Sequence, residues 1–322
     1  MRVVVVGLGV QGRKRLAIAG PEAVAVVDPV VKEGSPDLRG LPLFRTIDDV
    51  PVADYDAALV CTPDGAKVAI LRHLLSHGKH LLVEKPLIDD DDVVLEGLDV
   101  LARQNHAVCY TAYNHRFEPH IVALKEVLDS GRLGRVHLCK FFYGNGTARD
   151  VRNSAWRDQG LGVFPDLGSH LLDWTLQLFG KPAAEPELWR ASRFENRSFD
   201  HFHFGFRGGP DEPTPTLDYE MTLLSWRNTF RLDLFAEKGS AHIDCLCKWG
   251  PSVLTVRDRI LPSGRPTEAG RTLVCPDPTW EIEYAHFKTL CATPATNIAN
   301  DLWINGIFRK VGKLALPEGE KK

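Results

Sequence analysis

The sequence predicts a two-domain α/β protein, in which a doubly wound parallel sheet is followed by an α+β domain with an open, mostly antiparallel sheet. The chain has 322 residues, which is too long for one small core and suits two domains of ordinary size. In the first third, short aliphatic runs alternate with helical patterns, as parallel strands joined by crossover helices require. From residue 135 onward, segments that alternate apolar and polar residues dominate, separated by glycine and proline turns.

The first domain is predicted to span residues 1–117. Its buried strands are short β-branched runs, and its helices are longer segments with apolar residues at helical spacing. The strands are predicted at 2–6, 23–28, 56–61, 80–84 and 107–112, and the helices at 10–19, 46–50, 66–77 and 90–104. This alternation of strand and helix is what a doubly wound parallel sheet requires.

The second domain is predicted to span residues 118–322. It begins with a helix at 119–130, and a second clear helix begins near Pro165. The alternating segments lie at 135–144, 201–209, 216–226, 229–245 and 252–260. Such segments are typical of strands with one face in the core and one face in water. Residues 277–314 again read as helical, and these tail helices are candidates to pack back on the first domain.

The charge and composition of the chain argue against several classes of function. The formal net charge is −3 and no Lys/Arg-rich block occurs, so a nucleic-acid partner or an anionic membrane partner has little support. The longest aliphatic runs fall far short of the ~20 residues that span a bilayer. The first strand begins at Arg2, which leaves no room for a signal peptide. Most of the seven cysteines stand in apolar runs, so we expect a cytoplasmic, reduced and metal-free protein.

A glycine-rich turn near the start has the spacing of a dinucleotide-binding site. Gly7, Gly9 and Gly12 stand in a G-x-G-x-x-G arrangement between a predicted strand and a predicted helix. The first glycine permits the tight turn, the second lets the backbone approach a pyrophosphate, and the third lets the helix pack closely on the strand. The first domain is therefore predicted to be a Rossmann domain. Its predicted phosphate-binding segment comprises Gly7, Leu8, Gly9, Val10, Gln11 and Gly12.

An acidic residue follows at the position that selects the cofactor. Asp28 closes the second predicted strand, where a carboxylate bonds the 2′-hydroxyl of the adenosine ribose. The same carboxylate repels a 2′-phosphate, so we expect NAD(H) to be favoured over NADP(H). Lys32 and the cluster at 13–15 lie close enough in the sequence to weaken that preference.

A lysine stands at the carboxyl end of the strand predicted at 80–84. The strand belongs to the same parallel sheet as the glycine turn, and ligands bind beyond the carboxyl ends of such strands. Pro86 restricts Lys85 to an extended backbone, which fixes the direction of the side chain. The alternative is a solvated charge at a strand end, where most lysines are found. The sheet edge and the proline favour a lysine directed at a ligand.

Five blocks of sequence occur in an order that is typical of one protein family. They are GLGVQG at 7–12, Cys61-Thr62-Pro63 ahead of a helix, GKHLLVEKPL at 78–87, YNHRF at 113–117 and WRDQGLGVFPDLGSHLLDW at 156–174. On these blocks the chain resembles the Gfo/Idh/MocA family, which contains glucose–fructose oxidoreductases and inositol dehydrogenases. After about residue 180 the similarity is one of architecture rather than of motif.

The resemblance implies a set of site residues. In the family, the lysine of the Glu-Lys-Pro motif lies beside the nicotinamide and the reacting carbon, and acts with an Asp-x-x-x-His on a helix of the second domain. It follows that Lys85, Asp166 and His170 are the catalytic candidates. The implied cofactor contacts come from Cys61, Thr62, Pro63, Glu84, Lys85 and Asn114. The implied substrate contacts come from Lys85, Arg116, Trp156, Arg157, Asp166 and His170.

The helix predicted from about 166 to 179 is compatible with this assignment. Its core stripe comprises Leu167, Leu171, Trp174 and Leu178, and its polar stripe comprises Asp166, His170, Asp173 and Gln177. Residues four apart on a helix face the same way, so Asp166 and His170 are neighbours. Without the resemblance, the polar stripe reads as a solvated helix face with Asp166 as its N-cap.

These side chains suit hydride transfer at a carbinol carbon. The transfer requires a proton to leave or join the oxygen, and a histidine with an ordinary pKa near ~6.5 carries a proton at neutral pH. A lysine cation aimed at the same oxygen stabilises the developing alkoxide. Asp166 orients the histidine or holds a neighbouring substrate hydroxyl. The sequence leaves open whether His170 or Lys85 is the formal acid/base.

One loop departs from the family pattern. The family commonly follows its Thr-Pro with an asparagine and, a few residues later, a histidine. This chain has Asp64-Gly65-Ala66-Lys67 at those positions. The contacts that the 62–67 loop makes with the ribose and nicotinamide are therefore left open by the resemblance.

We expect an oxidoreductase that transfers a hydride between NAD(H) and a hydroxyl or keto carbon of a sugar, cyclitol or sugar nucleotide. Two alternatives stay open, an NAD-dependent glycosidase that oxidises its substrate transiently and a non-catalytic dinucleotide-binding regulator of the same fold. The joint presence of Lys85, Asp166 and His170 argues against the regulator. His201 and His203 alternate with phenylalanines, which predicts a polar sheet face. That face is expected to form a homodimer or homotetramer, or to floor the substrate cleft.

Overall fold

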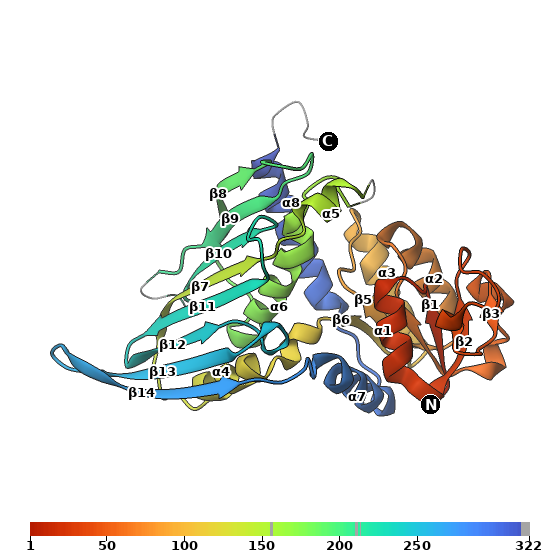
Figure 1. Ribbon diagram of the computed structural model, residues 1–322, viewed down its shortest axis with the longest axis horizontal. Helices are drawn as coiled ribbons and strands as arrows, with labels where there is room; N and C mark the ends of the chain where they lie inside the picture. The colour runs from red at the N-terminus through yellow and green to blue at the C-terminus, as the bar shows by residue number, and fades with distance from the viewer. Residues whose placement is uncertain (155–156, 210–211, 213, 317–322) are drawn as a thin grey trace. The chain divides into compact units, whose positions relative to one another are not determined.

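The computed structural model describes residues 1–154, 157–209, 212 and 214–316 (Figure 1). The chain forms two compact units. The first unit comprises Met1–Asn114 and Thr279–Asn305, and the second comprises His115–Pro278 with the described residues from Gly306 onward. The sequence analysis expected a boundary at residue 117, and the structure divides the chain at Asn114. The tail expected to be helical contributes to both units.

The first unit is built on a six-stranded sheet in the order β3-β2-β1-β4-β5-β6. All five neighbouring pairs are parallel, which confirms the predicted doubly wound sheet. The strands are β1 (Val3–Val6), β2 (Ala23–Val27), β3 (Leu43–Phe44), β4 (Ala57–Val60), β5 (His80–Glu84) and β6 (Cys109–Ala112). The helices are α1 (Val10–Ala19), α2 (Asp64–Ser76), α3 (Asp92–Gln104), α7 (Thr279–Ala292) and the first part of α8 (Ile298–Ala315).

Helices cover both faces of this sheet, as Figure 1 shows. On one face, Val4 belongs to a buried cluster with Leu71 of α2 and residues of α3. On the other face, Val3 belongs to a cluster with Leu16 of α1 and residues of α7. Because both faces are buried, the strands read as continuous aliphatic runs, and each buried valine stabilises the fold by roughly 1.5–3 kcal/mol.

The second unit is built on an eight-stranded sheet in the order β14-β13-β12-β11-β7-β10-β9-β8. Only β7 and β10 pair in parallel, so the predicted open, mostly antiparallel sheet is confirmed. The strands are β7 (Val136–Gly144), β8 (Pro186–Ser192), β9 (His201–Phe206), β10 (Thr216–Thr222), β11 (Thr229–Ala236), β12 (Gly239–Asp244), β13 (Ser252–Ile260) and β14 (Gly264–Leu273). The helices α4 (Pro119–Asp129), α5 (Ala148–Arg152) and α6 (Ser169–Leu178) belong to this unit.

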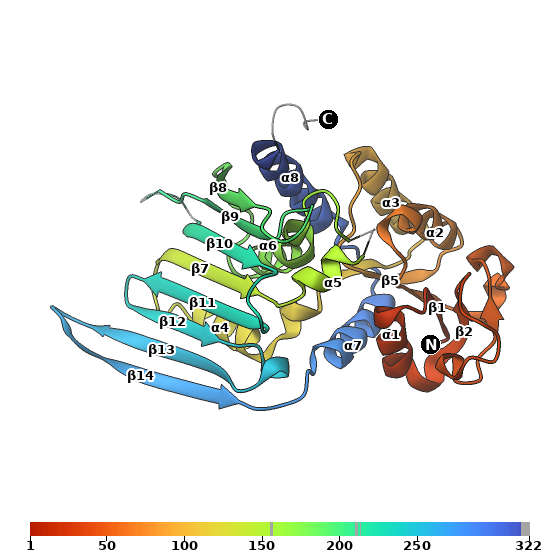
Figure 2. The ribbon, with the colours of Figure 1, turned by 45° about the horizontal axis from the view of Figure 1, so that its top comes forward.

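The two faces of this sheet differ. Figures 1 and 2 show α4 and α6 against one face, and no helix of the described residues covers the other. Phe202 and Phe204 of β9 are fully buried, whereas His201 and His203, which alternate with them, are half-buried. On the uncovered face, His203 Nε2 lies 2.8 Å from Asp218 Oδ1. The alternation predicted for this strand therefore produces the expected polar face.

Some elements differ from those predicted. Strand β14 was not predicted, because its sequence lacks an apolar alternation and nine of its ten residues are exposed. Strands β3 and β8 were also missed. The helix expected at 46–50 is a 3₁₀ turn at Ile47–Asp49, and the helix expected near Pro165 begins with a π-helical turn at Phe164–Gly168 before α6.

Short 3₁₀ turns connect several of these elements. They lie at Gly20–Glu22, Pro36–Leu38, Ile47–Asp49, Val52–Asp54, Asn114–Phe117 and Cys247–Trp249. Among the described residues, none of the helices is both long enough and apolar enough to span a membrane.

Candidate functional site

The predicted residues of the first unit follow the carboxyl ends of its parallel strands. Gly7 follows β1, Asp28 follows β2, Cys61 follows β4, Lys85 follows β5 and Asn114 stands two residues after β6. Parallel strands end at the same edge of a sheet, and this is the edge at which such sheets bind ligands. The first unit thus carries its share of the candidate site along one edge.

The glycine turn has the geometry that a pyrophosphate requires. Gly7 has φ +88°, a left-handed conformation, and a Cβ there would lie 2.9 Å from the carbonyl oxygen of Cys61. A Cβ at Gly12 would collide with the carbonyl oxygen of Gly7, so helix and strand approach closely only with glycine there. At Gly9 the space around a Cβ is open within 4 Å. The turn therefore leaves room for a phosphate against the amino end of α1, whose first turn carries no acidic residue.

Asp28 is held in its ionised form by backbone donors. Its Oδ2 accepts a hydrogen bond from Leu8 N at 2.8 Å, and its Oδ1 accepts from Val30 N at 2.8 Å and Val31 N at 3.0 Å. Burial disfavours the charge, but these donors and nearby Arg45 outweigh it, so the pKa of Asp28 lies below its ordinary value. An ionised carboxylate beside the glycine turn fits a ribose hydroxyl and disfavours a phosphate.

The loop after β4 offers a further polar atom to a ligand. Thr62 Oγ1 is buried, and no group of the described residues hydrogen-bonds to it. Cys61 precedes it, and burial together with nearby Glu84 raises the pKa of its thiol, so it stays neutral. The open space at Gly9, the ionised Asp28 and the unsatisfied hydroxyl of Thr62 together fit a dinucleotide.

Arg15 does not stand where the sequence suggested. It was grouped with the basic residues near the ribose, yet its side chain is only 1% exposed. Its Nε donates to Glu84 Oε1 at 2.6 Å and its Nη2 donates to Glu283 Oε2 at 2.7 Å. Arg13 is also engaged, 3.0 Å from Asp37. Arg15 is therefore an interior ion-pair residue and not an exposed cation of the cluster at 13–15.

Of the remaining candidates of the first unit, Glu84 and Lys85 are partly buried and Asn114 is buried. Lys85 directly follows β5, and its peptide bond to Pro86 is cis. Glu84 was assigned to the cofactor, and its carboxylate is hydrogen-bonded to Arg15. Asn114 is 6% exposed, and its Nδ2 donates to Thr279 Oγ1 at 2.7 Å.

In the second unit, His170 packs against an aromatic neighbour that the sequence analysis did not select. His170 lies on α6 and is 6% exposed. Its ring stacks on that of His115, with 3.9 Å between the centroids and 28° between the planes. His115 is held in turn, because its carbonyl accepts from Trp174 Nε1 at 2.8 Å and its Nε2 lies 2.7 Å from Lys248 Nζ. Only the position of His115 in the YNHRF block pointed to it.

Beside this stack, the buried Asp173 forms an ion pair with the partly exposed Arg116. Arg116 Nε lies 2.9 Å and 2.7 Å from the two carboxylate oxygens of Asp173, whose side chain is 1% exposed. Burial raises the pKa of Asp173 to about 6, although Arg116 opposes the rise. The polar stripe of this helix is therefore not a solvated face, since both His170 and Asp173 are buried.

Asp166 and Arg157 lie before the amino end of α6. Asp166 belongs to the π-helical turn, is 40% exposed, and its Oδ2 lies 3.6 Å from Arg157 Nη2. A π-helical turn inside a helix is rare and frequently marks a functional site. Trp156, the remaining predicted substrate contact, lies outside the described residues.

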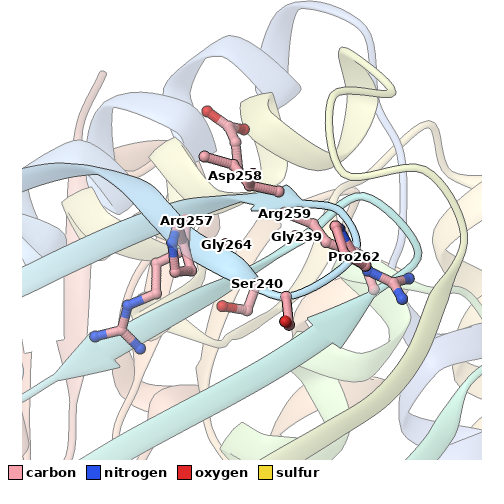
Figure 3. A pocket seen from close by; sticks show the side chains of 11 residues that line it. Gly239, Ser240, Arg257, Asp258, Arg259, Pro262 and Gly264 are labelled. Atoms are coloured by element: carbon pink, nitrogen blue, oxygen red, sulfur yellow. The ribbon is translucent and has the colours of Figure 1, made fainter.

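Two hollows of the second unit lie away from these residues. One, of about 330 Å³, opens beside the turn of the β13–β14 hairpin and is shown in Figure 3. Its lining includes Arg257, Arg259 and Asp258, the last of which forms an exposed ion pair with Arg132 at 2.6 Å. The other, of about 290 Å³, lies on the polar face of the sheet around Lys140, Asp218 and Arg231. Neither hollow is lined by a predicted catalytic residue.

Comparison with known proteins identifies both parts of the chain. Residues 1–113 match the model of an oxidoreductase family with an NAD-binding Rossmann fold, whose name is GFO_IDH_MocA. Residues 121–241 match the model of the GFO/IDH/MocA C-terminal domain. Together the two matches cover most of the chain.

Individual relatives are more distant. An inositol 2-dehydrogenase of Rhizobium meliloti is 30% identical over 51% of this chain and 49% of its own length. A scyllo-inositol 2-dehydrogenase (NADP(+)) of Bacillus subtilis is 27% identical over 54% of this chain and 48% of its own length. The chain thus matches about half the length of these relatives. The structure of a UDP-N-acetylglucosamine 3-dehydrogenase from Acidithiobacillus ferrooxidans shares the fold, with a TM-score of 0.75, 20% identity and coverage of 98% of this chain and 96% of that one.

Proposed function

The chain belongs to the Gfo/Idh/MocA family of oxidoreductases, and from this premise we propose that it is an NAD(P)-dependent dehydrogenase or reductase acting on CH–OH groups. The proposed reaction transfers a hydride between the cofactor and a hydroxyl or keto carbon of a sugar, cyclitol or sugar nucleotide. The observation that carries the proposal is the glycine turn, with open space at Gly9 and an ionised Asp28 beside it.

The proposed cofactor is NAD(H) in preference to NADP(H). Asp28 supports this preference, because its carboxylate bonds a ribose hydroxyl and repels a 2′-phosphate. The interior position of Arg15 and the ion pair of Arg13 with Asp37 remove two cations that would otherwise attract the phosphate. One of the relatives is named as an NADP(+) enzyme, so the preference requires measurement.

We assign the chemistry to three side chains. When bound, the nicotinamide ring accepts or supplies the hydride. Lys85, a cation at the carboxyl edge of the sheet, stabilises negative charge on the reacting oxygen. His170 takes up or returns the hydroxyl proton, and its ring plane is fixed by the stacked His115. Asp166 orients the substrate or His170, as the exposed carboxylate of the π-helical turn.

The proposed substrate contacts come from Arg116, Trp156 and Arg157, with Lys85, Asp166 and His170. The proposed substrate class is carbohydrate-like. Two of the relatives are named as inositol dehydrogenases, and the structural neighbour is named as a dehydrogenase of a sugar nucleotide. These names support polyhydroxylated substrates rather than simple alcohols.

We also propose that the chain forms a homodimer or homotetramer through the uncovered face of its eight-stranded sheet. That face carries histidine–carboxylate pairs, including His203 with Asp218 and His242 with Asp233. Charged groups of both signs on one surface suit pairing with a second copy of the same surface. Light scattering of the purified chain tests this directly, and a monomer at all concentrations would contradict it.

A substrate panel tests the proposed function. Sugars, cyclitols and nucleotide sugars are incubated with NAD⁺ or NADP⁺ while NADH absorbance is followed, beside a panel of glycosides. We expect net NADH formation with members of the first panel. Glycoside cleavage without net NADH would instead identify an NAD-dependent glycosidase, and cofactor binding without turnover in either panel would identify a regulator.

A further inference from the structure

A buried lysine that the proposed chemistry does not use contacts the segment carrying Lys85. Lys67 stands in the first turn of α2, and its side chain is 3% exposed. Its Nζ donates to Asp64 Oδ1 at 2.7 Å, to the carbonyl oxygen of Glu84 at 2.8 Å and to the carbonyl oxygen of Pro86 at 2.7 Å. A lysine ammonium has three N–H donors, so each donor has an acceptor.

Two of these acceptors are the backbone carbonyls on either side of Lys85. The ammonium of Lys67 therefore ties residues 84 and 86 to helix α2. The side chain of Glu84 is held separately, by Arg15 of α1 at 2.6 Å. The residues before and after Lys85 in the chain, Glu84 and Pro86, are thus both hydrogen-bonded to helices of the same unit.

We propose that Lys67 is a positioning residue, which fixes the backbone from which Lys85 reaches the substrate. The inference rests on the proposed function only in taking Lys85 to be catalytic. Its physical basis is that a displacement of about 1 Å in a reacting group lowers a rate by about 10²-fold. Charge-assisted hydrogen bonds from a buried ammonium to two carbonyls oppose such a displacement more strongly than neutral ones.

The environment of Lys67 argues against two simpler roles. As a filler of apolar space it would be a poor choice, because burying an ammonium costs several kcal/mol before its partners offset the loss. As a ligand of the cofactor phosphates it has no N–H left to donate, since all three bond acceptors of the protein. Anchoring the 84–86 backbone accounts for both its burial and its bonding.

The test compares Lys67→Met with Lys79→Met in the full chain. Lys79 is a matched control, because its Nζ also donates to a backbone carbonyl of the first unit, that of Tyr55 at 2.7 Å, but not to residues 84–86. The first measurement is hydrogen exchange of the amides at 84–88 without any ligand. We expect exchange there to be about tenfold faster or more in Lys67→Met and unchanged in Lys79→Met. Equal exchange in Lys67→Met and the wild type would overturn the proposal.

The second measurement separates positioning from binding. In Lys67→Met we expect kcat to fall by about 10²-fold while the dissociation constant of NAD⁺ changes by less than about threefold, and Lys79→Met should retain both values. A variant that loses NAD⁺ affinity but keeps kcat would overturn the assignment, because Lys67 would then serve the cofactor. A kcat within about threefold of the wild-type value would overturn it as well.

The two measurements distinguish a failure of the proposed function from a failure of the proposed role of Lys67. If the wild-type chain forms no NADH with any member of the panel, the proposed function is wrong, whereas exchange at 84–88 still decides whether Lys67 anchors that segment. If Lys67→Met does not fold, Lys67→Gln replaces it, since its side chain is shorter and uncharged and its amide has two N–H donors instead of three. For Lys67→Gln, faster exchange at 84–88 together with a reduced kcat would support the proposal. Wild-type values of both the exchange rate and kcat would overturn it.

Discussion

Asp28 and Asp173 show how surroundings set the charge of a side chain in this molecule. Asp28 accepts three backbone N–H bonds, which lower its pKa in spite of partial burial. Asp173 is fully buried, and Arg116 only partly offsets the burial that raises its pKa to about 6. Asp28 is thereby held as an ionised carboxylate, whereas Asp173 is a buried partner of Arg116. Each makes a separate prediction.

Replacement of Asp28 tests its role in cofactor choice. In Asp28→Ala we expect the affinity for NAD⁺ to fall and that for NADP⁺ to rise, so that the ratio of the two dissociation constants shifts by about tenfold or more. Fluorescence titration with both cofactors measures the ratio. Asp129→Ala is the control, because Asp129 is an exposed carboxylate that pairs with Lys125 on α4 of the second unit. An unchanged ratio in Asp28→Ala would remove this residue from the ribose site.

The raised pKa of Asp173 predicts a pH dependence of stability. The folded chain holds a proton on Asp173 up to about pH 6, whereas the unfolded chain releases it near its ordinary value of 3.8. Between these values the folded state binds more protons, so the contribution of Asp173 to the free energy of unfolding falls as pH rises. Relative to Asp173→Asn, the free energy of unfolding of the wild type should fall by about 2 kcal/mol between pH 4 and pH 6 in urea unfolding. A difference that stays constant or grows over this interval would contradict the assignment.

At the scale of elements, two glycines of the glycine turn differ in what requires them: Gly12 is needed for folding, and Gly9 is proposed to be needed for binding. Gly12 is required by the close approach of α1 to the backbone at Gly7, whereas Gly9 has open space and an ordinary backbone conformation with φ −69°. The sequence pattern predicted the packing task of Gly12, which the close approach to Gly7 bears out, and the phosphate contact at Gly9 stays a prediction. The space around a Cβ at each glycine depends on residues distant in the sequence, so it could be read only from the structure.

Two alanine substitutions test this division. Gly9→Ala should leave the free energy of unfolding within about 0.5 kcal/mol of wild type, while the dissociation constant of NAD⁺ rises about tenfold or more because the methyl group fills the space for the phosphate. Gly12→Ala should lower the free energy of unfolding by at least about 1–3 kcal/mol, because its methyl group meets backbone. Urea unfolding and cofactor titration measure both. Wild-type NAD⁺ affinity in Gly9→Ala would contradict the proposed phosphate site.

Other elements show where prediction from sequence stops. The parallel strands were predictable, because burial of both faces leaves a continuous aliphatic run such as that of β1. Strand β14 has no such signal, since its exposed residues face water on both sides and only its backbone pairs with β13. The π-helical turn at Phe164–Gly168 was read as the start of an ordinary helix, because proline is as acceptable there as in a first α-helical turn.

At the scale of the whole molecule, the order of motifs indicated the family and the strand patterns predicted the two sheets, while contacts between distant residues remained hidden. The bond from Arg15 to Glu283 joins positions 268 apart, and that from Lys248 to His115 joins positions 133 apart. No local pattern indicates either pair. The glycine turn, Asp28 and Lys85 were selected from the sequence pattern itself, and the other candidates by resemblance. The contacts of Lys67 and His115 became apparent only from the fold.

The most direct test of the central claim is Lys85→Met, measured with the substrate that the panel identifies. Methionine keeps the length of the side chain and removes its charge. We predict that kcat for NADH formation falls by about 10²–10³-fold while the dissociation constant of NAD⁺ changes by less than about threefold. Lys79→Met, which also removes a lysine of the first unit, should retain both values. NADH formation by Lys85→Met near the wild-type rate, with cofactor still bound, would contradict the assignment of Lys85 to hydride-transfer chemistry.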